Sequence, residues 1–278
     1  MSTNKEIKFT MHKSKKLFVK NRLVLHFNNV GNPYLSMYLY KNDRLDLSET
    51  YKFEEHEIVN GLPVNINKIA DIINNFVTKI DSIQLAITTD DLIKTTTSLP
   101  KISKAKAKKL YKAEVKNDIG ERKDNYIPFF EYYYHSLGYI FYTYYPPGTI
   151  VNNFVKVASL LKTKLTKVDL FSHFLFNNVK SIINEDYILH HDENEVSTFV
   201  LSFGKAFSGC ASFASKEENV KINYLSNIVK HNFELEKKEI DYIYSNNAKL
   251  VDDLNEVKDF EVSLETYNFK GIDLWKRV

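Results

Sequence analysis

The sequence predicts an α/β protein with a mixed β-sheet and a small inserted α+β subdomain. Segments with the two-residue alternation of strands and segments with the 3.6-residue spacing of helices follow one another along the chain. The 278 residues are 44% hydrophobic and 26% charged, which is typical of a globular protein with a sizeable core. Between residues 83 and 161 the pattern changes to two strand–strand–helix units, which indicates the insertion.

The first part of the chain is predicted to form three strands and a helix. Strands are expected over residues 17–27, 34–40 and 45–53, and a turn over residues 28–33 separates the first two. The segment Asn65-Ile66-Asn67 begins a helix. Apolar residues then recur at helical spacing, at Ile66, Ile69, Ala70, Ile73, Phe76 and Val77.

The middle of the chain is predicted to form the inserted subdomain. Its expected elements are strands over 83–87, 92–97, 129–135 and 139–145 and helices over 104–116 and 151–161. Pro100 ends the second strand, and Ser103 can cap the helix that follows it. Tyrosines dominate the last two strands. Because these tyrosines alternate along the strands, we expect them to pack in the core and on the sheet face. The competing interpretation is that they stack on the bases of single-stranded nucleic acid.

From residue 165 the pattern of the first part resumes. The expected elements are a strand over 165–170, a helix over 171–183, strands over 197–203, 209–215 and 219–225, and a helix from Ser226. The last 40 residues are charged and give no clear element. Trp275 stands beside basic residues there, which suits either a short anchor or a packed terminal turn.

The charge and cysteine content indicate the cellular setting. The net charge of +3 is too small to require a polyanionic partner. Only four of the 38 basic residues are Arg, at positions 22, 44, 122 and 277, and this scarcity argues against nucleic-acid recognition. The one cysteine, Cys210, permits no disulfide within the chain and fits a reducing cytosol. We therefore expect a cytoplasmic protein, with the inner face of the cell membrane as a further place of action.

The Lys-rich helix over 104–116 is the most unusual local feature. Lys104, Lys108, Lys112 and Lys116 recur every four residues and so form one basic stripe. The stripe is our candidate partner-binding surface, and its anionic partner is an acidic protein face, lipid headgroups or nucleic acid. The competing interpretation is a solvated helix face in a lysine-rich chain.

No motif for a metal, a cofactor or a catalytic nucleophile stands out. His190-His191-Asp192 are adjacent residues on an expected loop, where His side chains rarely converge on one ion, and no second pair with ligand spacing appears. Cys210 has no neighbouring His, which favours an inert thiol over a nucleophile. The sequence also lacks the G-x-x-x-x-G-K-[ST], G-x-G-x-x-G and G-x-S-x-G patterns. We therefore expect no catalytic residue, no metal and no cofactor.

Three segments resemble the family of the type IV pilus platform protein PilM and the cell-division protein FtsA. They are residues 61–77 (GLPVNINKIADIINNFV), residues 83–114 (IQLAITTDDLIKTTTSLPKISKAKAKKLYKAE) and residues 167–176 (KVDLFSHFLF). The resemblance spans about residues 20 to 225 and depends on element order and spacing. It implies an actin-like (RNase H-like) lobe over 1–80 and 165–236, an inserted SHS2-like subdomain over 81–164, and a C-terminal tail over 237–278.

The resemblance also locates two degenerate phosphate loops. Working members of the family bind Mg-ATP between two loops, each with an Asp and a Gly after a strand. Here the first loop has His26 and Asn28 at those places, and the second has Ser202 and Gly204. Neither His nor Ser replaces a carboxylate on Mg²⁺, which prefers anionic oxygen. Only 74 residues follow the second loop, which we expect to be too few for the family's second lobe.

These observations lead to one preferred function and two alternatives. The preferred function is a non-catalytic cytoplasmic scaffold that binds protein partners of a membrane-associated bacterial machine, with cell division slightly favoured over pilus assembly. Self-association through the inserted subdomain and peripheral contact with the membrane are consistent with it. The alternatives are a divergent ATPase of the actin-like superfamily and a nucleic-acid-binding module that uses the Lys-rich helix.

Overall fold

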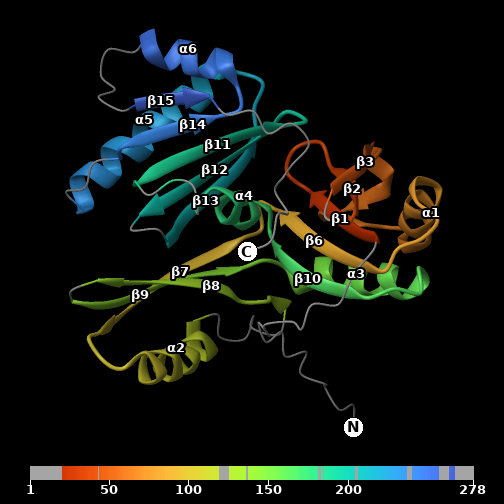
Figure 1. Cartoon of the computed structure of the whole chain (residues 1–278), viewed down its shortest axis with the longest axis horizontal. Helices are drawn as coiled ribbons and strands as arrows, with labels where there is room; N and C mark the ends of the chain where they lie inside the picture. Colours follow the sequence, from red (N-terminus) through yellow and green to blue (C-terminus); the bar gives the residue numbers. More distant parts are fainter. Residues whose placement is uncertain are drawn as a thin grey trace.

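The computed structural model describes residues 21–42, 44–118, 125–135, 137–180, 183, 185–203, 206–236, 240–256 and 263–266. Its described part contains two five-stranded sheets, a three-stranded sheet and a two-stranded ribbon. In Figure 1 the two large sheets lie on opposite sides of helix α4, and the three-stranded sheet lies below them. We call the two large sheets, with their helices, the first and the second lobe.

The first lobe has the strand order β10-β6-β1-β2-β3. Its strands are β1 Asn21–Asn28, β2 Tyr34–Lys41, β3 Arg44–Lys52, β6 Ser82–Thr88 and β10 Leu165–Leu170. Strands β1, β2 and β3 are antiparallel neighbours, whereas β6 and β10 run parallel to β1. Between β3 and β6 come the 3₁₀ turn η1 Glu55–Glu57, the ribbon β4 Ile58–Val59 with β5 Leu62–Pro63, and α1 Ile66–Phe76.

Two helices cover one face of the first lobe. They are α1 and α3, which spans Gly148–Leu160, and both pack on an apolar cluster with the inner side chains of β1, β2 and β6. The predicted start of α1 is confirmed, because the Asn65 Oδ1 atom accepts a hydrogen bond from the Lys68 amide at 3.1 Å. Ile69 and Ile73 are fully buried, so the apolar spacing in the sequence does mark the helix face that meets the sheet.

The inserted subdomain leaves the first lobe after β6 and returns before α3. It consists of a sheet of order β7-β9-β8 and one helix, with β7 Ile93–Pro100, α2 Lys104–Asp118, β8 Phe129–His135 and β9 Gly138–Tyr145. The ring of Tyr111 on α2 stacks on that of Phe141 at 4.3 Å. Gly138 has a φ of +150°, and a Cβ there would overlap the Leu99 carbonyl, so the β8–β9 turn requires glycine.

The second lobe has the order β13-β12-β11-β14-β15, which repeats the first lobe strand by strand. Its elements are β11 Tyr187–Glu193, β12 Val196–Phe203, β13 Ala206–Ala214, α5 Glu218–Glu236, β14 Tyr242–Ser245, α6 Ala248–Glu256 and β15 Ser263–Thr266. The first three strands are again antiparallel, and the last two run parallel to the first. The chain therefore contains the same sheet twice.

Helix α4, Phe171–Val179, joins the lobes and fills the space between them. Its apolar side chains belong to one cluster with residues of both sheets, among them Tyr38 of β2 and Leu189 of β11. Phe174, Leu175 and Phe176 are each at most 2% exposed. Burial of that much apolar surface holds the lobes against a common core.

The structure corrects several sequence predictions. The strands expected over 83–87 and 92–97 form, but β6 belongs to the first lobe and β7 to the inserted sheet. The strand expected over 219–225 is instead part of α5, because Leu225 packs against α6 and β14 in the second-lobe core while neighbouring polar residues face outward. The segment expected as a loop at His190-His191-Asp192 lies within β11.

The expectation that too few residues remain for a second lobe is also corrected. Strands β14 and β15 both come from the segment over 237–278 that was expected to be a tail. Each strand has only four residues. Because they are so short, the residues after β13 are enough to complete a five-stranded sheet. Trp275 lies outside the described residues. None of the helices in the described ranges combines the length and the apolar character that a membrane span requires.

Candidate functional site: the seam between the two lobes

The first strand of each lobe carries a histidine within hydrogen-bond distance of a hydroxyl group on the parallel neighbour, and β11 carries His191 as a second histidine. In the first lobe, the Nε2 atom of His26 on β1 lies 2.9 Å from Oγ1 of Thr88 on β6. In the second lobe, the Nδ1 atom of His190 on β11 lies 2.8 Å from Oγ of Ser245 on β14. Both hydroxyl groups come from the parallel neighbour of the first strand, but Ser245 lies directly opposite His190, whereas Thr88 lies two residues beyond the partner of His26.

Glu193, the last residue of β11, crosses from the second lobe to the first. Its Oε2 atom lies 3.0 Å from Nδ1 of His26, and its Oε1 atom accepts hydrogen bonds from Ser36 at 3.1 Å and Tyr38 at 2.7 Å. The imidazole of His26 is also stacked on Phe171, with ring centroids 3.7 Å apart. The carboxylate therefore binds both of the strands that flank the first turn of the first lobe.

The electrostatics of this contact favour the ionised carboxylate. Burial opposes the charge, but the neighbouring His26 and its hydrogen bond outweigh it and lower the pKa of Glu193 to about 2. Burial and the same carboxylate raise the pKa of Tyr38, which therefore stays a hydrogen-bond donor. A buried carboxylate with three donors around it has the satisfied environment that such a group requires.

The β1–β2 turn lies directly against the second lobe. Val30 and Tyr34 form a small buried cluster with Val196, the first residue of β12. Gly31 has a φ of +62°, and a Cβ at this position would overlap the Cβ of Ala214 at the end of β13. These contacts and those of Glu193 together form a closed seam, which we define by residues 26–36 of the first lobe and 193–196 with Ala214 of the second.

Asp192, the other acidic residue at the end of β11, is held within the second lobe. It binds His190 Nε2 at 2.9 Å and Lys221 Nζ at 2.7 Å, and it accepts from Ser197 and Asn247. Although burial opposes ionisation, these donors hold the pKa of Asp192 well below its ordinary value. Both carboxylates near the seam are therefore engaged by protein donors.

The residues predicted for the phosphate loops are only partly brought together. His26 and Asn28 lie at the seam, where Asn28 is fully buried and donates to the Val30 carbonyl at 2.8 Å. Ser202 is fully buried near the end of β12, opposite Tyr187, on the second hairpin of its lobe. The hairpin of the second lobe that corresponds to β1–β2 is β11–β12, and its first strand ends at Glu193. Gly204 lies outside the described residues.

Glu193 was not predicted from the sequence. The segment 187–193 (YILHHDE) combines three apolar residues with four polar ones, so the alternation that marks a strand is absent. One signal was available: Asn194-Glu195 precedes an apolar run, and a polar pair between two extended segments favours a hairpin. Both residues have positive φ, as a two-residue hairpin turn requires.

A second polar cluster fixes the inserted subdomain to the first lobe. His173 on α4 binds Asp169 Oδ1 at 2.8 Å through Nδ1 and Glu131 Oε1 of β8 at 2.9 Å through Nε2. Burial disfavours the charged imidazole, yet the Asp169 charge prevails and raises the pKa of His173 to about 9. A protonated His173 therefore bridges two carboxylates that belong to different sheets.

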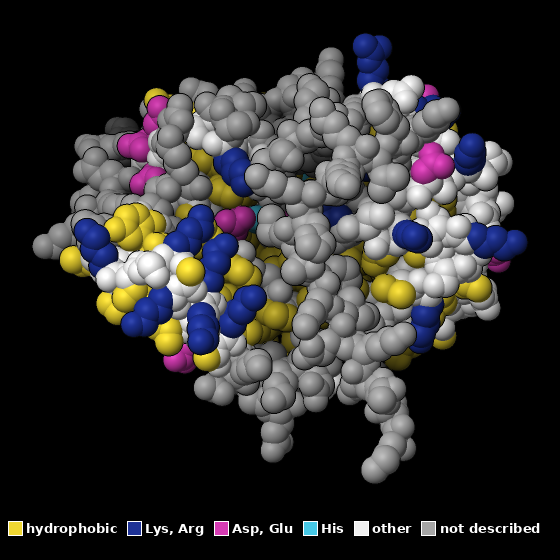
Figure 2. Space-filling view, turned by 60° about the horizontal axis from the view of Figure 1, so that its bottom comes forward, with side chains coloured by type: hydrophobic (Ala, Val, Ile, Leu, Met, Phe, Trp, Pro, Cys, Tyr) yellow, Lys and Arg dark blue, Asp and Glu magenta, His cyan; other side chains and the backbone are white. Residues whose placement is uncertain are grey.

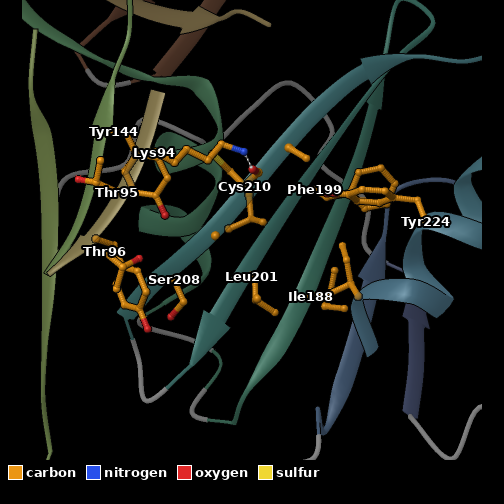
Figure 3. Close-up of a pocket in the computed structure, with 15 residues that line it drawn as sticks. Lys94, Thr95, Thr96, Tyr144, Ile188, Phe199, Leu201, Ser208, Cys210 and Tyr224 are labelled. Carbon is orange, nitrogen blue, oxygen red and sulfur yellow. Dashed lines mark hydrogen bonds between the residues drawn. The ribbon is translucent and has the colours of Figure 1, made fainter. Parts of the chain in front are cut away.

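A cavity of about 280 Å³ lies between the inserted sheet and the second lobe. As Figure 3 shows, Thr95 and Thr96 of β7 line one side, and Ser208 and Cys210 of β13 line the other. Lys94 donates to the Cys210 carbonyl across it. In the described part of the chain β7 pairs only with β9, and β13 only with β12, so two strand edges border the cavity.

The Lys-rich stripe lies far from the seam, on the outer side of the inserted subdomain. Lys104, Lys108 and Lys112 are exposed on α2, and the side chain of Lys116 lies outside those described. In the described residues, no group of three or more His, Cys, Asp or Glu is arranged to hold a metal ion. The structure therefore offers three separate features: the seam, the cavity and the stripe.

Comparisons with known proteins show the fold. No protein-family model matches the sequence, and a search of the curated proteins finds no relative. Among solved structures, a "PilM-PilN type IV pilus biogenesis complex" matches with a TM-score of 0.63 and 12% identity, over 89% of this chain and 88% of that chain. A Bacteroides thetaiotaomicron protein "with actin-like ATPase fold and unknown function" matches with a TM-score of 0.52 and 13% identity, over 90% and 91%.

A third structure belongs to a secretion machine. The cytoplasmic domain of EpsL, an inner membrane component of the Vibrio cholerae type II secretion system, matches with a TM-score of 0.50 and 8% identity, over 81% of each chain. At these identities the likeness concerns the fold. This chain has the actin-like fold, and it resembles PilM over nearly its full length.

Proposed function

We propose that this protein is a non-catalytic actin-like adaptor that binds protein partners in a membrane-associated bacterial machine. Its fold supports this, because two of the matching structures come from a pilus biogenesis complex and from an inner-membrane secretion component. The same two structures favour a pilus or secretion machine over the division machine that composition slightly favoured. A similar fold does not by itself imply the same function. The proposal therefore depends on the contacts between the two lobes at the seam.

The observation that carries the proposal is the closed contact between the lobes. A nucleotide held between the lobes would need its triphosphate beside the β1–β2 and β11–β12 turns. Glu193 already occupies that space and binds His26 and Tyr38, and Gly31 lies against Ala214. A triphosphate brought there would also meet a buried carboxylate, and two like charges in a low-dielectric site repel strongly.

Calorimetric titration with Mg-ATP tests the loss of nucleotide chemistry. We expect no heat of binding and no phosphate release for the unaltered protein. The Glu193→Ala variant, which removes the carboxylate from the seam, is the matched comparison and is also expected to hydrolyse nothing, since it gains no metal ligand. Micromolar, Mg²⁺-dependent binding by the unaltered protein would favour the divergent ATPase and end the adaptor proposal.

For the partner's contact point, the cavity between β7 and β13 is the best candidate. An extended segment of a partner can lie along the edge of a strand, and its alternate side chains can then enter an adjacent cavity. Thr95, Thr96 and Ser208 supply polar groups there, whereas Phe199 and Leu201 supply apolar surface. A cavity of mixed character suits a peptide with alternating side chains.

The cellular location provides an independent test. A fluorescent fusion of the adaptor is expected to gather at the cell envelope with the other components of its machine. A variant with Thr96→Trp, which fills the cavity from β7, should lose that location while it remains folded. An even distribution of the unaltered fusion through the cytoplasm would contradict the proposal.

A further inference from the structure

The outer face of the inserted subdomain combines positive charge with exposed apolar side chains. Six lysines in and beside α2 are exposed: Lys101, Lys104, Lys106, Lys108, Lys109 and Lys112. Glu114 is the one acidic residue between positions 101 and 115. Figure 2 shows Lys and Arg side chains gathered on the side where α2 lies, with hydrophobic side chains between them. We call this surface the basic face.

The lysines are held on the outside because the opposite side of α2 is anchored. Ala107 and Tyr111 are at most 1% exposed and pack against the inserted sheet. The Tyr111 hydroxyl lies 2.7 Å from the Thr143 hydroxyl beneath the helix. Since these contacts fix the rotation of α2 about its axis, the charges have a defined orientation before any partner arrives.

Apolar side chains protrude among the charges. Leu110 of α2 is 41% exposed, and Phe130, Tyr134 and Leu137 of the adjacent β8–β9 hairpin are 39%, 48% and 78% exposed. The Nζ atoms of Lys104 and Lys108 each lie 5.3 Å from the centre of the Tyr132 ring. These two ammonium groups thus lie over an aromatic ring, and charged and aromatic groups meet on the basic face, which is the combination that suits a boundary between water and an apolar phase.

We propose that the basic face docks on an anionic lipid bilayer. Ammonium groups would meet the headgroup phosphates, and Leu110 and the hairpin aromatics would enter the interface below them. Single apolar side chains that protrude from a helix and from the adjacent hairpin suit a fluid bilayer, which deforms around each one. A rigid protein partner would instead need a matching pocket for each side chain. The absence of Arg between residues 101 and 115 disfavours nucleic acid.

Sedimentation with lipid vesicles tests the proposal on the full chain. We expect binding to vesicles of phosphatidylcholine and phosphatidylglycerol in equal parts, little binding to phosphatidylcholine alone, and loss of binding at high salt. The variant Lys104→Gln, Lys108→Gln, Lys112→Gln should weaken binding by about tenfold or more. A control with the same charge change on the first lobe, Lys52→Gln, Lys79→Gln, Lys164→Gln, should bind within about twofold of the unaltered protein.

Fluorescence separates insertion from simple charge attraction. Leu110→Trp should shift its emission to the blue when anionic vesicles are added, because the indole leaves water. Leu47→Trp, at a position of similar exposure on β3 (47%), should show no shift. Equal effects of the two lysine triples, no shift for Leu110→Trp, or binding to poly(U) RNA without binding to vesicles would each overturn the proposal.

The lipid proposal deepens the adaptor function by naming one partner surface, yet the two can fail separately. The vesicle assay contains no nucleotide, so Mg-ATP binding by this protein would leave the lipid result in place. Conversely, if the protein binds neither Mg-ATP nor anionic vesicles, the adaptor proposal stands and the proposal that the basic face contacts the membrane is rejected.

Discussion

The Oε2 atom of Glu193 lies 3.0 Å from the Nδ1 atom of His26, and this contact joins the ends of the first strands of the two lobes. His26 is 1% exposed in its side chain and Glu193 is 17% exposed, so solvent screens the pair only weakly. With Ser36 and Tyr38 on the other carboxylate oxygen, the contact forms a polar centre beside the apolar cluster of Val30, Tyr34 and Val196.

Replacing Glu193 should destabilise the protein. Glu193→Ala leaves His26 and Tyr38 without their acceptor in a buried place, and losing one partner of such a pair costs about 3 kcal/mol. Urea unfolding measures the difference. Glu195→Gln, on the exposed turn next to it, is the control and should stay within about 0.5 kcal/mol of the unaltered protein. Equal stability of the two variants would contradict a closed seam.

The same carboxylate predicts a stability that depends on pH. The pKa of Glu193 is lowered from 4.5 to about 2, so its contribution is present above pH 4.5 and is lost as the pH falls towards 2. The loss of stability in acid should therefore be smaller for Glu193→Ala than for the unaltered protein. Parallel acid titrations of the two proteins, followed by circular dichroism, measure this difference.

Gly31→Ala should also destabilise the seam, for two separable reasons. The alanine would adopt a positive φ, and its Cβ would overlap Ala214. We expect a loss of about 2 kcal/mol or more in free energy of unfolding. Adding Ala214→Gly removes the overlap but keeps the strained backbone, so the double variant should recover part of the loss. No recovery would mean that the turn and β13 do not touch.

The bridge through His173 predicts a loss of stability in alkali. Its pKa is raised from 6.5 to about 9, so the protonated bridge stabilises the fold fully below pH 6.5 and is lost as the pH rises through 9. A shift of that size corresponds to about 3 kcal/mol. Thermal unfolding between pH 6 and 9.5 measures the effect, and His173→Gln should flatten the curve. His56→Gln, an exposed histidine on η1, should leave the curve unchanged.

Cys210 should behave as a weakly reactive thiol inside the cavity. Burial raises its pKa above the ordinary 9.0, and the Lys94 charge acts in the opposite direction. Alkylation by iodoacetamide at pH 8 should therefore be about tenfold slower than in the urea-unfolded chain. Lys94→Gln should move the midpoint of the rate–pH profile upward, whereas Lys101→Gln should not. Because Cys210 is the one cysteine, mass spectrometry reads the reaction directly.

The local sequence pattern was sufficient to predict most helices and strands of the first lobe and the inserted subdomain. The Asn65 cap and the spacing of Ile69 and Ile73 predict α1 because the same residues that favour the helix also bury its inner face. Pro100 does end β7, and the predicted cap at Ser103 precedes α2, with the Lys106 amide 3.4 Å from the Ser103 hydroxyl. In these segments local preference and tertiary packing agree.

The second lobe and the seam could not be predicted in the same way. Strand β11 carries His190 and Asp192 inward because Ser245, Lys221 and Asn247 supply partners from distant segments. A single sequence contains no signal for such contacts, and so the polar strand resembles a loop. The four-residue strands β14 and β15 are likewise too short for a periodic pattern to stand out.

Within the described residues the chain passes from one lobe to the other once, along α4. Every strand of the first sheet precedes this helix, and every strand of the second follows it. A break in the backbone between Lys180 and Glu185 would therefore leave each sheet intact on its own fragment. The apolar surface around α4 and the carboxylate of Glu193 would remain as complementary halves, so two co-expressed pieces should reassemble without a covalent link. The fold thereby offers a natural place to divide the protein into a split reporter of its own assembly.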